Sequence, residues 1–178
     1  MDNGVINAVQ HSDFINLVAK SILKEDGLTF SFVREEFLAD GSYFILYQAQ
    51  SSAILLEIQP NVTKISLKRS IEKCLEVQNH IDVQPFLVLL CTDKIPLSVR
   101  SMLSPDLQNP HWQTLNSTVW AEKCLVISKD GISFSEDEAS QHLDPLVVLA
   151  LYFSDDEEQK LKLRNIGDPT MQLIHSFH

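Results

Sequence analysis

The sequence predicts a single α/β domain of the α+β type, with a mixed central sheet flanked by helices. Residues 42–59 form two strand-like runs, and the second, 53–59, is almost continuously apolar until Glu57. A run of this kind is typical of a central strand that helices cover on both faces. Residues 84–92 form another such run, and a helical pattern over 63–81 separates the two. This order predicts a β–α–β unit, whose crossover should be right-handed.

The elements before this unit predict an antiparallel meander. Asp40-Gly41 is the strongest hairpin signal of the chain, because this dipeptide suits a tight turn between strands. Pro60-Asn61 is expected to end the third strand, because proline cannot donate a ladder hydrogen bond. The expected elements are a helix from Asp13 to about Lys24 capped by Ser12, a strand over 28–38, a strand from 42 that the pair Ser51-Ser52 ends, and a strand over 53–59.

The second half predicts further helices around one more strand, within a single domain spanning residues 1–178. The expected elements are a short helix over 95–103, an irregular stretch over 104–116, a strand over 119–128, a loop or helix start over 135–141, and helices over 145–153 and 157–164. A helical extension is expected from about residue 143. Its first part, 143–153, is hydrophobic all round, which indicates either a buried helix or one shared with a partner.

Charge restricts the classes of partner. The chain has 24 acidic and 14 basic residues, for a net charge of -10 at pH 7. Nucleic-acid binding needs a basic face, so a nucleic-acid partner is not expected. Membrane partners are not expected either, because the apolar runs are too short to span a bilayer. The first residues lack the basic and apolar regions of a signal peptide, and we expect a cytoplasmic or vacuolar protein.

The three cysteines, Cys74, Cys91 and Cys124, lie in apolar surroundings and lack metal-ligand spacing. This pattern favours buried structural thiols. Their odd number nevertheless leaves room for one intermolecular disulfide. Trp112, within the irregular stretch, is the expected aromatic anchor of an interface. These four residues are therefore the interface candidates.

The order of helix, three-strand meander, helix and strand resembles the restriction-endonuclease-like, or PD-(D/E)XK, nuclease family. The resemblance covers roughly residues 12–92. Its specific point is Leu-Leu-Glu-Ile-Gln at 55–59, which resembles the Glu-x-Gln variant of transposase-associated relatives. The resemblance implies that Glu57 is the third-strand acid that binds a divalent metal. It also implies that Gln59 is the residue that helps to position the attacking water.

The sequence departs from the family pattern at the second strand, where an Asp should supply another metal ligand. Residues 43–47 contain no acid. Asp40 is the nearest acid, but the Asp-Gly turn already accounts for it, and Glu36 belongs to the first strand. Phosphodiester hydrolysis with Mg²⁺ needs carboxylates held in near-octahedral geometry. We therefore expect a degenerate site with no catalytic residue and no cofactor. The alternative is a Mg²⁺-dependent DNA endonuclease that uses Glu57, Gln59 and either Asp40 or Glu36.

The expected function is that of a non-catalytic structural protein that self-assembles into homo-oligomers or a lattice. The chain as a whole also resembles small vacuolar crystal-forming proteins of early-diverging fungi, although no particular motif carries this similarity. A buried carboxylate without a metal needs a cation or several donors, or it takes up a proton. We expect such a partner for Glu57 from the long helix, where Lys64, Lys68 and Arg69 are the candidates.

Overall fold

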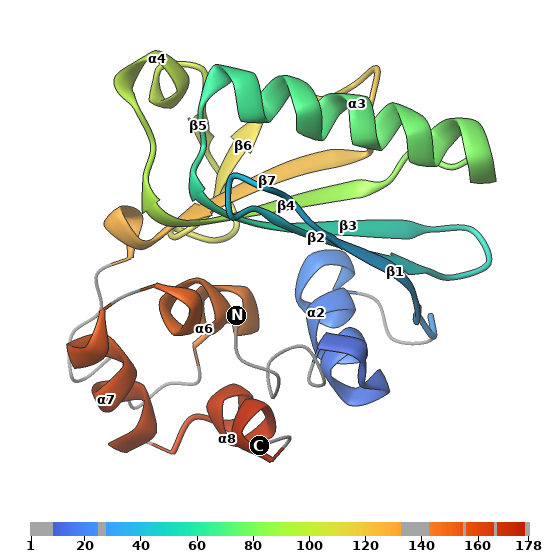
Figure 1. Cartoon of the computed structure of the whole chain (residues 1–178). Coiled ribbons are helices and arrows are strands. Elements are labelled where there is room, and N and C mark those ends of the chain that lie inside the picture. Colours follow the sequence, from blue (N-terminus) through green and yellow to red (C-terminus); the bar gives the residue numbers. More distant parts are fainter. Residues whose placement is uncertain (1–8, 25–27, 133–142, 155, 166, 177–178) are drawn as a thin grey trace.

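A computed structural model of the chain describes residues 9–24, 28–132, 143–154, 156–165 and 167–176. One seven-stranded mixed sheet runs through it, with strand order β1-β2-β3-β4-β7-β6-β5. Helices lie on both faces of this sheet (Figure 1), so the prediction of a mixed sheet flanked by helices is confirmed. The strands are β1 (Ser31–Phe37), β2 (Tyr43–Gln48), β3 (Ala53–Asn61), β4 (Phe86–Lys94), β5 (Ser104–Pro105), β6 (Gln113–Leu115) and β7 (Lys123–Ser128).

The sheet has a parallel centre between two antiparallel parts. β1, β2 and β3 form the predicted antiparallel meander, and β3, β4 and β7 are parallel. β7, β6 and β5 are antiparallel again. Gly41 occupies the turn before β2 with φ +82°, a conformation that glycine adopts without strain.

Two helical layers cover the sheet (Figure 1). α3 and the short α4 lie over one face, and the remaining helices lie over the other. The pleat of β3 divides its side chains between the layers: Ile54, Leu56 and Ile58 enter the core beneath α2 and α6, whereas Leu55 enters the core beneath α3. The helices are α2 (Ser12–Leu23), α3 (Lys64–Ile81), α4 (Leu97–Arg100), α6 (Pro145–Phe153), α7 (Glu157–Asn165) and α8 (Pro169–His175).

α3 begins at a capping box, in which the Thr63 side chain accepts from Ser66 N and Ser66 Oγ accepts from Thr63 N. Its buried side includes Leu67, Ser70, Cys74 and Val77. Leu75, which the periodicity places on the buried stripe, is 40% exposed, and that prediction is wrong.

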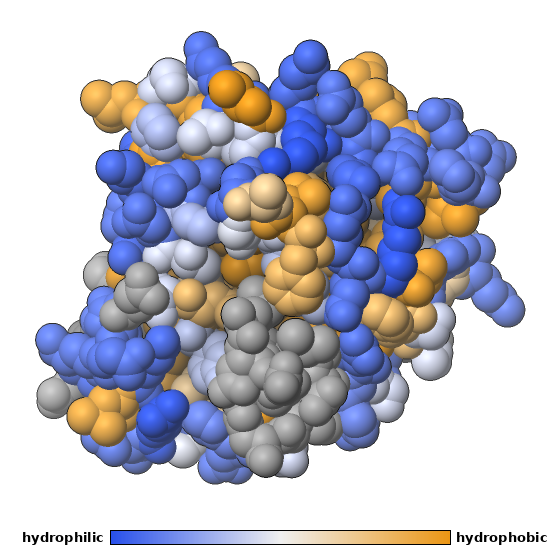
Figure 2. All heavy atoms as spheres, viewed as in Figure 1, coloured by the Kyte–Doolittle hydropathy of each residue, from blue (hydrophilic) through white to orange (hydrophobic). Residues whose placement is uncertain are grey.

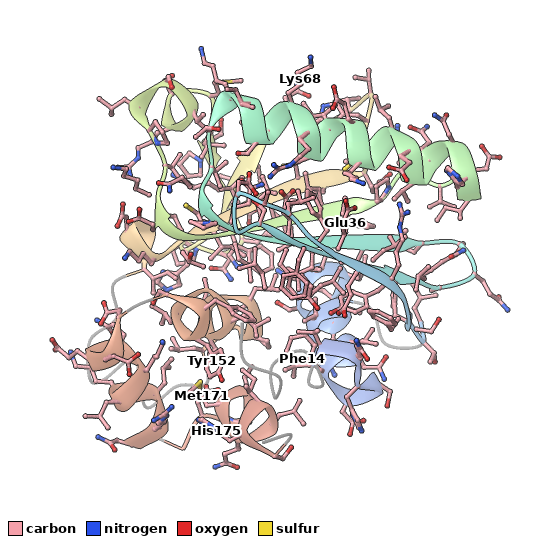
Figure 3. The ribbon with its side chains drawn as sticks, viewed as in Figure 1. Phe14, Glu36, Lys68, Tyr152, Met171 and His175 are labelled. Carbon is pink, nitrogen blue, oxygen red and sulfur yellow. The ribbon has the colours of Figure 1, made fainter. Side chains whose placement is uncertain are left out.

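α6 is the centre of the opposite layer. Asp144 caps it by accepting a hydrogen bond from Leu146 N, and Pro145 occupies its first turn. Every residue from 146 to 151 is buried, because the helix packs against β4, β7, α2, α7 and α8. Phe14 of α2, Tyr152 and Met171 of α8 lie in this layer (Figure 3). The hydrophobicity of 143–153 therefore reflects burial within the chain.

Several boundaries differ from the predictions. β3 continues through Pro60 to Asn61, because a register shift against β4 between Gln59 and Asn61 accommodates the proline. The stretch 104–116 contains the two short strands β5 and β6. His11, rather than Ser12, caps α2 by accepting from Asp13 N. The loop or helix start predicted over 135–141 lies outside the described residues.

Among the helices of the described ranges, none combines the length and the apolar composition needed to cross a membrane.

Candidate functional site

Glu57 lies in the layer between the sheet and α3, and its side chain is fully buried. The alternation of β3 directs Glu57 and Gln59 to the same face as Leu55. α3 crosses above them and supplies Arg69 and Ser70. We call Glu57, Gln59, Ser70, Arg69 and Asp40 the Glu57 network.

Three groups contact the Glu57 carboxylate. Ser70 Oγ donates to Oε2 at 2.6 Å, and Gln59 Nε2 donates to Oε1. Arg69 Nη2 lies 3.5 Å from Oε1. The prediction of a basic partner from α3 is confirmed for Arg69. It is wrong for Lys64 and Lys68, which are exposed. Lys68 points away from the sheet (Figure 3) and lies 3.8 Å from Glu72.

Arg69 also binds the turn between β1 and β2. Its Nη1 donates to Asp40 Oδ2 at 2.6 Å, and its Nη2 donates to Ser42 Oγ at 2.9 Å. The guanidinium carbon lies 5.5 Å from the centroid of the Phe44 ring, within reach of a cation–π contact. One guanidinium therefore connects a buried carboxylate to a half-exposed one.

Burial dominates the titration of Glu57. Loss of water raises the pKa of Glu57 to about 7, although Ser70, Arg69 and Gln59 each favour the charged form. Asp40 behaves in the opposite way, because its hydrogen bond from Arg69 lowers its pKa. Glu57 thus exchanges its proton near neutral pH while Asp40 stays ionised.

Of the two acids considered as second metal ligands, Asp40 shares a partner with Glu57. Asp40 also keeps its predicted turn role, since its Oδ1 accepts from Ser42 N at 3.1 Å. Glu36 instead accepts from Lys73 Nζ at 2.8 Å, on the side of the sheet that faces α3 (Figure 3). Lys73 also lies 3.5 Å from Glu76, so Glu36 belongs to a separate surface ion pair.

The residues of the network do not fit a divalent metal. Magnesium needs free carboxylate oxygens around an octahedral centre. Here both oxygens of Glu57 accept from protein donors, and the cation that Glu57 and Asp40 share is a guanidinium. In the part of the chain that the structure describes, no group of three or more His, Cys, Asp and Glu residues is placed to hold a metal ion.

The interface candidates are all buried. Trp112 is 2% exposed and belongs to the core beneath the sheet, so it is unavailable as an exposed anchor. Cys74, Cys91 and Cys124 are buried free thiols, as their apolar surroundings predict. Burial raises the pKa of Cys124 to about 12 and also raises the pKa of Cys74 and Cys91. Since disulfide exchange requires an accessible thiolate, these thiols cannot link copies in this fold.

Sequence reasoning missed Ser70, which belongs to the Glu57 network, and Ser42, which accepts from Arg69 of that network. Ser70 carries a recognisable signal, because it lies between Leu67 and Cys74 on the buried stripe of α3. A hydroxyl on an apolar stripe needs a polar partner, and Glu57 is the buried polar residue opposite. Ser42 has no comparable signal, because a serine after an Asp-Gly turn is ordinary turn composition.

No family model, curated protein or solved structure matches the chain.

Proposed function

We propose that this chain is a non-catalytic structural protein, built on a degenerate PD-(D/E)XK-like fold, that assembles into homo-oligomers. One observation carries the non-catalytic part: the Arg69 guanidinium lies between Asp40 and Glu57. The charge that a metal would neutralise in a nuclease is already neutralised by a side chain of the same domain.

The order of elements agrees with the proposed relation to nucleases. α2 is followed by the meander β1-β2-β3, then by α3 and by β4 parallel to β3. Glu57 and Gln59 project from the third strand beneath α3, as the resemblance implies for the acid and the residue two positions later. The departure lies in their partners, because Gln59 donates to Glu57 rather than facing solvent where a water could be positioned.

The chemistry of arginine explains why this arrangement favours structure over catalysis. A guanidinium keeps its charge at all ordinary pH values. A divalent cation entering the site would meet this fixed charge and would have to displace both Ser70 and Gln59 from Glu57. Removing Arg69 would leave the buried carboxylate without its cation, a change that typically costs about 3 to 5 kcal/mol for a buried pair, so the arginine has a structural role between α3 and the sheet.

Charge and surface composition support self-assembly. A net charge of -10 keeps copies apart near pH 7. Apolar residues lie between hydrophilic ones on the face shown in Figure 2. Among the described residues, four large apolar ones are more than three-quarters exposed, and contacts between copies could bury them: Ile65, Leu97, Leu107 and Val119.

A cleavage assay tests the non-catalytic part. Wild-type protein and Glu57→Gln are incubated with supercoiled plasmid and with single-stranded DNA, in Mg²⁺ and in Mn²⁺. We expect no cleavage above the level of Glu57→Gln in either metal. Metal-dependent cleavage by the wild type that Glu57→Gln abolishes, and that the exposed control Glu122→Gln retains, would establish the alternative, a metal-dependent endonuclease.

A further inference from the structure

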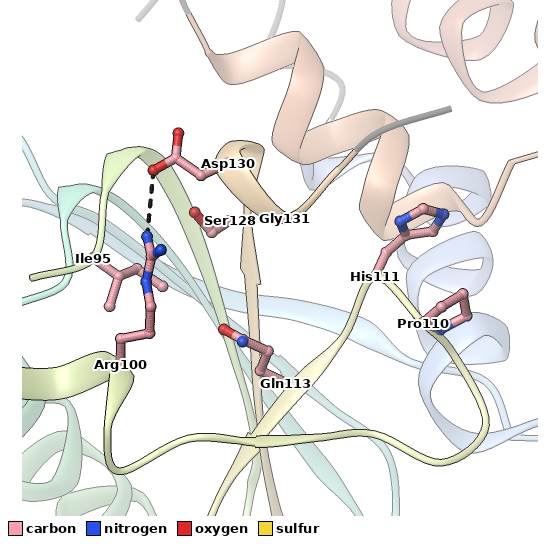
Figure 4. Close-up of a pocket in the computed structure, with 8 residues that line it drawn as sticks. All are labelled: Ile95, Arg100, Pro110, His111, Gln113, Ser128, Asp130 and Gly131. Carbon is pink, nitrogen blue, oxygen red and sulfur yellow. Dashed lines mark ion pairs between the residues drawn. The ribbon is translucent and has the colours of Figure 1, made fainter. Parts of the chain in front are cut away.

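A hollow of about 110 Å³ with a mixed polar and apolar lining opens beyond the ends of β4 and β7, and it shares no residue with the Glu57 network (Figure 4). β4 leads into Ile95, and β7 ends at Ser128. These two strands are parallel and adjacent, and the carboxyl ends of parallel strands are where ligands commonly bind in α/β sheets. The hollow is lined by Ile95, Arg100, Pro110, His111, Gln113, Ser128, Asp130 and Gly131.

Ser128 provides a buried hydroxyl that lines the hollow. The residue is 6% exposed, and within the described chain its Oγ has no hydrogen-bond partner. Buried hydroxyls are nearly always hydrogen-bonded, because an unpaired polar atom away from water is costly. A group inside the hollow is therefore the natural partner of Ser128.

His111 and Gln113 add further unused hydrogen-bonding capacity. Both line the hollow from the segment that contains β6. Neither side chain makes a hydrogen bond or an ion pair with any residue in the described ranges. Together with Ser128, they supply hydroxyl, amide and imidazole groups from two separate parts of the chain.

Arg100 and Asp130 bring opposite charges to one side of the hollow. Arg100 Nη2 lies 3.5 Å from Asp130 Oδ2 (Figure 4), which is long for a charge-assisted hydrogen bond. Their side chains are 47% and 44% exposed, and an exposed pair at this distance contributes little to stability. Each charged group can therefore turn toward a ligand at little cost.

We propose that this hollow binds a small zwitterion of the α-amino acid class. The ligand's carboxylate binds Arg100, with Ser128 as an additional donor, and its ammonium group binds Asp130. A simple anion fits less well, because Asp130 would repel it. A sugar fits less well, because Ile95, Pro110 and Gly131 offer no aromatic face for stacking. A cavity of this size holds several waters, which leaves room for the carboxylate and ammonium groups of an amino acid.

Calorimetry and ligand-observed NMR on the full chain test this assignment. The probes are L-alanine, L-serine and L-glutamine, with sodium acetate and methylammonium as the two halves of the ligand and inorganic phosphate as a plain anion. We expect saturable binding of at least one amino acid and much weaker binding of acetate, methylammonium and phosphate. Equal or tighter binding of acetate or phosphate would show an anion site instead, and failure of all three amino acids would overturn the proposal.

Substitutions of the two charged lining residues test whether the amino acid binds in this hollow. Arg100→Gln and Asp130→Asn should each raise the Kd of the bound amino acid about tenfold or more, because each removes a charged partner. The exposed residues Arg164 and Asp93 provide matched controls, and Arg164→Gln and Asp93→Asn should leave the Kd unchanged. Circular dichroism shows whether each variant is folded. A folded Arg100→Gln that binds as tightly as the wild type would contradict the assignment, whatever the cleavage assay shows.

Discussion

Glu57 has two hydrogen-bond arrangements, one for each protonation state. When it is ionised, Ser70 Oγ donates to Oε2 at 2.6 Å. When it is protonated, its own hydroxyl can donate to Ser70 Oγ, and Ser70 can then donate to Ser66 O, which lies 2.9 Å away. Ser70 thus has a partner in both states. This explains how a carboxyl with a pKa of about 7 fits a fully buried site.

The direction of this shift determines how stability varies with pH. The pKa of Glu57 is 4.5 in its unperturbed state and about 7 in the fold. Between these values the unfolded chain has lost its proton while the folded chain keeps it, so rising pH favours unfolding. Glu57→Gln removes this dependence. We expect the wild type to lose stability relative to Glu57→Gln from pH 5 to 7.5, with a slope of up to about 1.4 kcal/mol per pH unit. Urea unfolding at low protein concentration measures it.

Two further variants make this test specific. Glu122→Gln, at an exposed position, should reproduce the wild-type slope. Arg69→Met should extend the dependence to higher pH, because the guanidinium lowers the pKa of Glu57 in the fold. Parallel curves for the wild type and Glu57→Gln would mean that Glu57 does not change protonation in this range.

At the scale of elements, the sequence predicts best where local pattern and burial agree. The predicted helix over 145–153 has the bounds of α6, because an Asp-Pro start and a long apolar run indicate both its type and its burial. β5 and β6 were missed, because two and three residues carry no periodicity. Their strand character comes from pairing with each other and with β7, and such nonlocal pairing leaves no local signal.

The candidate site likewise combines residues with a local sequence signal and contacts that depend on the assembled fold. Glu57 and Gln59 stand out because they are polar residues in an apolar run. The choice among Lys64, Lys68 and Arg69 depends on the rotation of α3 about its axis, which the sequence defines only approximately. The contact between Arg69 and Asp40 spans 29 residues. It requires the hairpin turn and the middle of α3 to meet at one edge, which follows only from the assembled sheet.

α6 is expected to contribute most to stability among the helices of its layer. Leu149 is fully buried at its centre, and truncating a buried leucine typically costs about 2 to 5 kcal/mol. We therefore expect Leu149→Ala to lower the free energy of unfolding by this amount in urea titrations. Leu161→Ala on α7 is the matched control, because Leu161 is 57% exposed, and it should change stability by less than about 0.5 kcal/mol. Similar losses for both variants would place α6 outside the cooperative core.

At the scale of the whole molecule, the free edge of β1 is unsuited to strand addition between copies. The C-terminal half of β1 carries Arg34, Glu35 and Glu36. The register of β1 against β2 shifts between Phe32 and Arg34. Charged side chains and irregular register protect sheet edges against pairing with another chain. Assembly at the β1 edge should therefore use side-chain contacts between surfaces rather than continuation of the sheet.

Self-association should increase as the pH falls from 7.5 to 5. The net charge of -10 at pH 7 falls toward zero as the pH approaches the isoelectric point near 4.9, and repulsion between copies falls with it, while apolar contacts persist. High salt at pH 7.5 should act in the same direction, because it screens the same repulsion.

Sedimentation velocity and light scattering should show a defined oligomer or an ordered lattice. Ile65→Asp and Leu97→Asp, at sites 83% and 81% exposed, should weaken it, whereas Asn16→Asp, which adds the same single charge at an exposed polar position, is the matched control. A monomer across the whole range, or amorphous precipitate without a defined species, would contradict assembly as the function.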